Sequence, residues 1–139
     1  MLEIVFEDVS EFSLEESAVS SWYSSVAIQE KKEVGDITLI FCSDDYLLEV
    51  NRQYLDHDYY TDIITFDYSN FPLVSGDLFI SIDRVKVNAI DFNVSFEHEL
   101  HRVIIHGFLH LCGYFDKTDE DELLMRSKEN QALSLIGFV

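Results

Sequence analysis

The segment 103–111 is apolar at nearly every position, yet it carries His106 and His110. A helix this apolar has to be buried in the core, so it constrains the fold more than any other part of the chain. We expect this helix to span 96–111 and to end near Gly113, a residue type that suits the position after a helix end. Histidines four residues apart share one helix face, and burying two unpaired rings is costly. Both rings therefore need partners.

A metal ion is one such partner. Two histidines at this spacing can bind one Zn²⁺ at about 2.0–2.1 Å, and a turn at Gly113 can bring Asp116 back toward them. The sequence predicts one Zn²⁺ per chain, held by His106, His110 and Asp116. A zinc-bound water in the open fourth position would be the catalytic group, because zinc lowers its pKa to about 7. The alternative is that the histidines are hydrogen-bonded core residues and that Asp116 belongs to the acidic N-terminus of the next helix.

Position 107 separates this segment from the familiar metalloprotease pattern. In His-Glu-x-x-His, the glutamate that follows the first histidine is the general base. Here Gly107 stands in that place, although the ligand spacing resembles that of metzincin proteases. A peptidase would need a base from elsewhere in the fold, so the pattern counts against peptide hydrolysis.

The rest of the chain alternates strand and helix signals. Ser43 and two capping boxes, Ser13 with Glu16 and Thr118 with Asp121, mark helix starts. The expected strands span 2–7, 37–42, 62–68 and 76–82, and the expected helices span 13–32, 44–55, 84–91, 96–111 and 118–135. The last two strands should form a hairpin. We expect one domain over 1–139 with an α+β fold close to α/β: a small mixed sheet of about four strands, about five helices and a zincin-like metal helix.

Charge and composition exclude several classes of protein. The chain has 27 acidic and 9 basic side chains, a net charge of −18, so it cannot act as a basic nucleic-acid coat. The longest uncharged stretches, 17–29 and 103–115, have 13 residues each and fall short of the ~20 that cross a bilayer. The first residues lack a signal-peptide pattern, and Cys42 and Cys112 sit in apolar surroundings that favour free thiols. These features predict a cytoplasmic protein.

The metal segment also resembles the hallmark of the YbeY family of bacterial endoribonucleases, His-Gly-x-Leu-His-Leu-x-Gly-Tyr-Asp-His. The match runs position by position from His106 to Tyr114. Further similarity lies upstream, in Leu48-Glu49-Val50-Asn51 with Tyr54, Thr61-Asp62-Ile63-Ile64-Thr65-Phe66, Gly76-Asp77-Leu78-Phe79-Ile80-Ser81 and Glu99-Leu100. The resemblance covers residues 45–130, and the expected element order suits the family fold.

Two positions depart from the family pattern. Asp116 stands where the family has a third histidine, and zinc accepts a carboxylate oxygen at about 2.0–2.2 Å. Leu55 stands where the family has an arginine after the aromatic residue, and Arg52 on the same predicted helix is the candidate substitute. The first departure bears on metal binding, and the second bears on how a substrate phosphate is held.

The resemblance implies a single-strand-specific, zinc-dependent endoribonuclease. Its implied role is ribosomal RNA maturation, including the 3′ end of the small-subunit RNA, and ribosome quality control. The candidate substrate-binding residues are Arg52, His57, Thr61 and Asp62. Each of these four side chains also suits an ordinary surface or loop role. Glu99, seven residues before His106, either orients that ligand or faces solvent.

The charge of −18 disfavours binding to naked RNA. The expected partner is therefore ribosomal RNA in a ribosomal particle, or a ribosomal protein that recruits the enzyme, and neither DNA nor a membrane. Two alternatives stay open: a metal-dependent hydrolase of another substrate, such as a metzincin-like peptidase, and a non-catalytic ribosome-associated adaptor with structural zinc. Gly107 and the upstream motifs favour the endoribonuclease, whereas Leu55 keeps the adaptor open.

Overall fold

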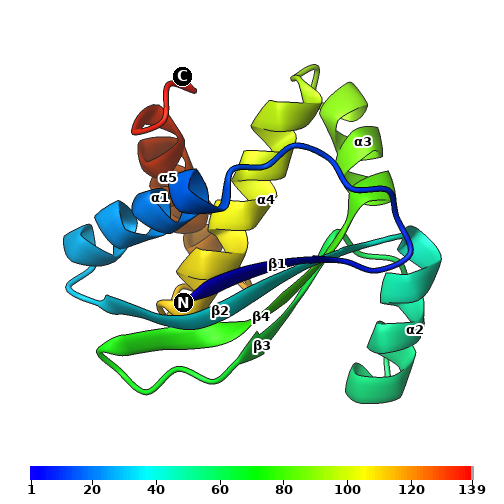
Figure 1. Ribbon diagram of the computed structural model, residues 1–139, viewed down its shortest axis with the longest axis horizontal. Helices are drawn as coiled ribbons and strands as arrows, with labels where there is room; N and C mark the ends of the chain where they lie inside the picture. Colours follow the sequence, from blue (N-terminus) through cyan, green and yellow to red (C-terminus); the bar gives the residue numbers. More distant parts are fainter. Residues whose placement is uncertain (139) are drawn as a thin grey trace.

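A four-stranded sheet with helices on both faces forms the protein in the computed structural model, which describes residues 1–138 (Figure 1). The strands are β1 (Leu2–Phe6), β2 (Glu33–Cys42), β3 (Ile63–Asp67) and β4 (Leu73–Ser81). The helices are α1 (Glu16–Gln29), α2 (Asp44–Leu55), α3 (Ile82–Asp91), α4 (Phe96–Leu111) and α5 (Asp119–Ser134). The predicted α+β class and the predicted order of elements are confirmed.

The sheet is mixed, with strand order β1-β2-β4-β3. The strands β1, β2 and β4 are parallel, and helices connect them, because parallel strands need a long crossover. β3 runs antiparallel to β4 and forms the predicted hairpin with it. β3 consequently lies at one edge of the sheet, where it contacts α4.

Alternation along the strands divides the apolar side chains between two cores. In β4, Leu78 and Ile80 face the larger core, which also contains side chains of α1, α4 and α5. Phe79, between them, packs against a smaller core that includes Leu47 and Val50 of α2. Figure 1 shows the same division, with α2 set apart from the other helices. The larger core therefore holds α4, the helix that carries the two histidines.

Helix α4 is fitted tightly against the edge of the sheet at Gly107. A Cβ atom at this position would lie 2.7 Å from Cδ1 of Ile63 and 2.9 Å from Cδ1 of Leu78. Ser95 caps the helix start by accepting a hydrogen bond from the backbone N–H of His98 at 3.0 Å. Gly113, with φ of +108°, turns the chain back after the helix end. Close packing at Gly107 and the chain reversal at Gly113 thus position the segment from His106 to Asp116.

Helices α2 and α4 have the predicted bounds, whereas the predicted cap of α1 is wrong. The helix begins at Glu16, and its N-cap residue Glu15 makes no side-chain capping bond. Phe12 and Leu14 pack against the larger core, and the ring centroid of Phe12 lies 5.0 Å from that of Phe41. This packing holds the preceding segment outside the helix, so Ser13 does not cap it.

One further expectation differs from the structure. β2 begins at Glu33, four residues before the predicted start, and its pairing with β4 shifts register between Val34 and Ile37. Both cysteines are free and buried, as predicted. Within residues 1–138, no helix combines the length and the apolar character that a membrane span requires.

Candidate metal centre

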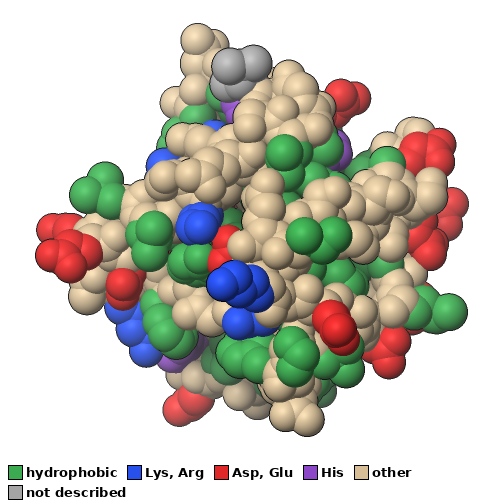
Figure 2. Space-filling model, turned by 90° about the vertical axis from the view of Figure 1, so that its left-hand side faces the viewer, with side chains coloured by type: hydrophobic (Ala, Val, Ile, Leu, Met, Phe, Trp, Pro, Cys, Tyr) green, Lys and Arg blue, Asp and Glu red, His purple; other side chains and the backbone are tan. Residues whose placement is uncertain are grey.

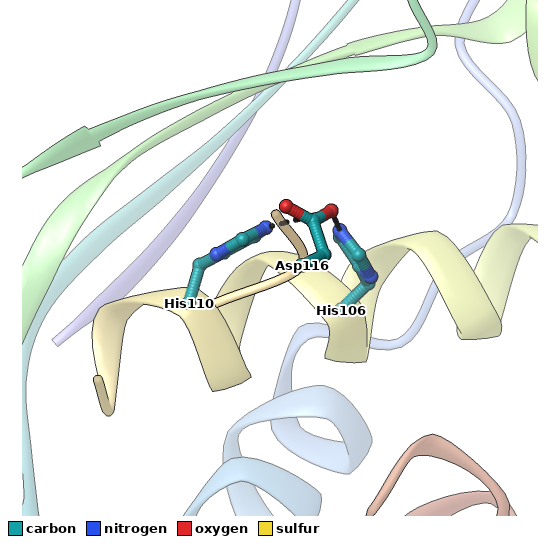
Figure 3. A group of neighbouring side chains, drawn as sticks. All are labelled: His106, His110 and Asp116. Atoms are coloured by element: carbon teal, nitrogen blue, oxygen red, sulfur yellow. Dashed lines mark ion pairs between the residues drawn. The ribbon is translucent and has the colours of Figure 1, made fainter. Parts of the chain in front are cut away.

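His106 and His110 project from one face of α4, and Asp116 meets them from the turn after the helix (Figure 3). The Nε2 atoms of His106 and His110 lie 3.4 and 3.5 Å from Oδ2 of Asp116. All three donor atoms lie within 4.8 Å of one another. Tetrahedral zinc with bonds of about 2.0–2.1 Å keeps its ligand atoms about 3.4 Å apart. The two nitrogen-to-oxygen distances therefore match those of ligands on one metal ion of that size.

The second nitrogen of each ring is fixed by a hydrogen bond. Nδ1–H of His106 donates to Oε2 of Glu129 at 2.6 Å. Nδ1–H of His110 donates to the carbonyl oxygen of Tyr114 at 2.8 Å. Since each proton sits on Nδ1, the Nε2 lone pair of each ring is free to bind a metal. The two rings are held in the tautomer and the orientation that a metal ligand needs.

Glu129 is itself held by a cation. Nη1 of Arg102 lies 3.0 Å from Oε1 of Glu129, the carboxylate whose other oxygen binds His106. Burial acts to raise the pKa of Glu129, but its hydrogen bonds and charge interactions with His106 and Arg102 outweigh burial and lower it. Glu129 is therefore ionised at neutral pH and acts as a strong acceptor for the imidazole N–H.

The pKa values of the two histidines are shifted in opposite directions. Burial acts to lower the pKa of His106, but the hydrogen bond and the charge of Glu129 raise it above its ordinary value. Burial and the neighbouring His106 lower the pKa of His110. His110 is consequently neutral near pH 7 and available as a ligand, whereas a proton competes with the metal chiefly at His106.

The role of Glu129 was missed by the sequence analysis. It lies on α5, 23 residues after His106, so no local spacing connects the two. Among residues 1–138, the carboxylate that accepts the His106 hydrogen bond is Glu129. The expectation that Glu99 faces solvent is wrong, because that side chain is only 2% exposed. An orienting role for Glu99 stays a prediction. One signal was present: Glu129 shares the buried side of α5 with Met125, Ala132 and Leu133. A carboxylate on such a face needs a partner.

A cavity of about 740 Å³ lies beside the metal group, and His106 and Asp116 form part of its wall. Asp62, one of the candidate substrate-binding residues, also lines this cavity. Burial raises the pKa of Asp62, and the charge of His106 opposes the shift. The hydroxyl of the adjacent Thr61 lies 3.5 Å from the carbonyl oxygen of Ile63, which is the loop-to-strand contact that any such residue can make.

Arg52 and His57 lie apart from the metal group. Nε of Arg52 pairs with Asp58 at 2.6 Å, and this guanidinium is about half exposed on α2. The ring of His57 stacks on that of Tyr59, with 5.2 Å between centroids. Among the described residues that line the 740 Å³ cavity, neither Arg52 nor His57 is present. Their contact with a phosphate stays a prediction.

Comparison with known proteins identifies the family. The family model named Endoribonuclease YbeY matches residues 5–137. Endoribonuclease YbeY of Flavobacterium psychrophilum is 59% identical over 121 residues, which cover 87% of this chain and 86% of that protein. The same-named protein of Phocaeicola vulgatus is 52% identical over 137 residues, 99% of each chain. The solution structure of TM1509 from Thermotoga maritima has a TM-score of 0.66 at 26% identity, covering 97% of this chain and 91% of that one. This chain belongs to the endoribonuclease YbeY family.

Proposed function

We propose that this protein is a zinc-dependent endoribonuclease that cuts single-stranded RNA in the cytoplasm. Its proposed role is ribosomal RNA maturation, including the 3′ end of the small-subunit RNA, and ribosome quality control. Family membership supports RNA cleavage. The observation that carries the metal requirement is the convergence of two oriented Nε2 atoms on the Asp116 carboxylate at 3.4 and 3.5 Å.

The residues of the chain divide the work of holding and orienting the metal. A bound zinc ion supplies a Lewis acid for a phosphate oxygen and lowers the pKa of water. His106 and His110 would hold it through Nε2, and Asp116 would hold it through a carboxylate oxygen. Glu129 and the carbonyl of Tyr114 keep the two rings from rotating away. With two neutral histidines and one carboxylate, the loaded site keeps a net charge of about +1, which attracts an anionic phosphate.

The exposure of the site favours catalysis over a structural role. The side chain of Asp116 is 44% exposed, and with His106 it borders the 740 Å³ cavity. Structural zinc is usually enclosed by four protein ligands, whereas catalytic zinc keeps three ligands and an open position. A site at the wall of a cavity suits an enzyme better than a zinc-stapled adaptor.

The packing at Gly107 also weakens the peptidase alternative. A glutamate at this position would act as the base in a metalloprotease. Here any side chain at 107 would meet Ile63 and Leu78 at less than 3.0 Å. The face of α4 that would carry the base is therefore used for packing against the sheet.

A ribosomal particle is the proposed partner. The chain carries a net charge of −18, so long-range attraction to free RNA is absent. Lys and Arg side chains nevertheless gather near the middle of one face of the molecule (Figure 2). Such a face can meet RNA that a ribosomal particle already holds in place, which supports a recruited enzyme.

A single-strand RNA cleavage assay tests this proposal. The protein is loaded with one equivalent of Zn²⁺ and compared with a chelated sample, a sample refilled with Zn²⁺, and His110→Ala. We expect cleavage only in the loaded and refilled wild type, and native mass spectrometry should find one zinc that His110→Ala lacks. The matched control is His98→Ala on the same helix, which should keep both zinc and cleavage. Cleavage that persists in His110→Ala would contradict a role for this metal group, and cleavage of casein without RNA cleavage would favour a peptidase.

A further inference from the structure

The cavity beside the metal group extends along α4 toward the start of that helix. Its walls come from three helices, and Figure 1 shows α3 and α5 on different sides of α4. Asn88 and Phe92 line it from the α3 side, and Leu123 and Arg126 line it from α5. Glu99 lies on α4, seven residues before His106, so the two positions are about 10 Å apart along the helix axis. Glu99 therefore lies along the cavity wall at some distance from the metal group, which leaves room for part of a substrate between them.

Glu99 is a buried acceptor without a hydrogen-bond partner. The side chain is 2% exposed and lines the cavity, and its Oε1 atom has no hydrogen bond within residues 1–138. The nearest cation is Nε of Arg102 at 3.7 Å, which is too long for a hydrogen bond. Burial raises the pKa of Glu99 to about 7, although Arg102 acts in the opposite direction. An unpaired carboxylate oxygen is a costly feature of this wall, and a hydrogen-bond donor that enters the cavity would complete it once the carboxyl group turns toward the cavity.

The remaining wall residues decide what kind of ligand fits. Acidic side chains outnumber basic ones along the cavity wall. The basic residues are Arg102 and Arg126, and the acidic residues are Asp62, Glu99, Asp116, Asp119, Glu122 and Glu129. A phosphate group is therefore repelled from the interior and stays at the metal. The apolar side chains of Phe92 and Leu123 are 56% and 73% exposed, and they offer flat or flexible surface at the rim. The interior suits a planar group that donates hydrogen bonds.

We propose that this cavity receives the nucleobase next to the cleaved phosphate, and that Glu99 selects a base carrying an amino group. The inference rests on the proposed RNA cleavage. Adenine, cytosine and guanine each present an amino N–H donor that a carboxylate accepts. Uracil presents one N–H between two carbonyl oxygens, and these oxygens repel a carboxylate. The enzyme therefore discriminates against uracil at one of the two nucleotides that flank the cut.

Glu99→Gln separates this role from simple packing. Glutamine has nearly the same shape, but its amide offers an N–H donor as well as an acceptor. The amide donor can pair with a uracil carbonyl, so uracil should be accepted. Glu97→Gln is the matched control, because Glu97 is an exposed glutamate on the same helix and lies outside this group of wall residues.

The test digests a random-sequence single-stranded RNA to low conversion with zinc-loaded protein and sequences both product ends. The digestion is run at about pH 8.5, above the pKa of about 7 of Glu99, so that this side chain is an ionised acceptor. The wild type and Glu97→Gln should deplete uracil at one flanking position by about tenfold relative to the input, the discrimination expected of a specific hydrogen-bonded base contact. Glu99→Gln should lose most of that depletion while it still cleaves the other three bases. An equal base distribution in the wild type, or an unchanged depletion in Glu99→Gln, overturns the inference.

A binding measurement keeps this test distinct from the test of RNA cleavage. If the loaded wild type does not cut RNA at all, the proposed function fails, and the cavity is then judged by calorimetry with cytidine and uridine 5′-monophosphate. Tighter binding of the cytidine nucleotide by the wild type, lost in Glu99→Gln, supports the inference. Equal binding of the two nucleotides by the wild type overturns it.

Discussion

At the scale of single residues, the histidines are oriented from behind by two different kinds of acceptor. The partner of His106 is a charged side chain from another helix, and the partner of His110 is a backbone carbonyl in the next turn. A side-chain acceptor can be replaced by mutation, whereas the carbonyl can only be moved. The two ligands therefore respond to different kinds of substitution.

Replacing Glu129 by Gln should weaken zinc binding without removing a ligand. Gln can still accept from Nδ1–H of His106, but it lacks the charge that strengthens this bond at 2.6 Å. Loss of such an outer partner typically lowers metal affinity by about 10–100-fold. A competition titration with a chromogenic chelator measures the change. Glu120→Gln, an exposed position in the first turn of α5, should leave the affinity unchanged. An unaltered affinity in Glu129→Gln would show that the bond does not orient the ligand.

Zinc affinity should fall as the pH drops through the mildly acidic range. Glu129 raises the pKa of His106 above its ordinary value of 6.5, so the proton displaces zinc from this ring at a higher pH than from an unperturbed histidine. Glu129→Gln removes that charge, so its zinc affinity, although weaker at neutral pH, should begin to fall only at a lower pH than in the wild type. Chelator titrations between pH 5 and 8 give the zinc dissociation constant of each protein as a function of pH. An affinity that begins to fall at the same pH in both proteins, or at a higher pH in the variant, contradicts this account.

At the scale of elements, the turn after α4 joins the fold to the metal group. Gly113 has φ of +108°, and the next residue supplies the carbonyl that holds His110. Few residues other than glycine adopt this conformation without strain. The backbone conformation at one position thus determines where a ligand ring points.

Gly113→Ala should lower both stability and zinc affinity. The strained φ should cost roughly 1–3 kcal/mol of unfolding free energy, since an L-residue at such an angle is forced. Movement of the Tyr114 carbonyl should weaken the hold on His110. Gly137→Ala is the control: its φ is +91° and its Cβ would meet nothing within 4 Å. It should lose some stability but keep its zinc affinity. Equal zinc affinity in both variants would show that the conformation of the turn does not affect metal binding.

The sequence predicted elements whose boundaries are set locally and missed features set by distant packing. Ser43 and Thr118 cap α2 and α5 through their own side chains, so the starts of both helices were predicted correctly. The start of α1 is set by Phe12 packing on Phe41, a contact across many residues, and the local capping signal at Ser13 was misleading. The metal group could be predicted because its three residues lie in one short segment of the chain. The contact of Glu129 with His106 and the shape of the cavity depend instead on how α5 packs on α4. Spacing along the chain carries no information about that docking.

At the scale of the whole molecule, the core does not depend on the metal group. The large core includes fully buried side chains from β2, β4 and α4, such as Phe41, Ile80 and Phe108. The candidate metal ligands His106, His110 and Asp116, by contrast, are 22–44% exposed, and His106 and Asp116 line the cavity. Zinc should therefore add to the stability of a chain that is already folded.

Removal of zinc should lower the melting temperature but leave the secondary structure intact. A ligand at 100 times its Kd stabilises the folded state by about 2.7 kcal/mol, which corresponds to a shift of roughly 10 °C for a chain of this size. Circular dichroism with and without chelator measures both the melting temperature and the helix content. His110→Ala should melt at the same temperature in either condition. Loss of the helical signal on chelation would make the zinc structural and would favour the adaptor alternative.

The close contact at Gly107 also limits how this scaffold can evolve. A glutamate at position 107 would turn this segment into the His-Glu-x-x-His pattern of a metalloprotease. In the sequence, this is a single substitution. In the folded protein, the new Cβ would lie 2.7 Å from Ile63 and 2.9 Å from Leu78, so both would have to shrink or move first. Both contacts are with the ends of side chains, which can move by changing rotamer, but Leu78 is buried in the larger core and Ile63 packs against it, so moving them disturbs their own neighbours. A glutamate at position 107 therefore needs a second adjustment inside the core, and the change of one residue type would not by itself give this scaffold the base of a peptidase.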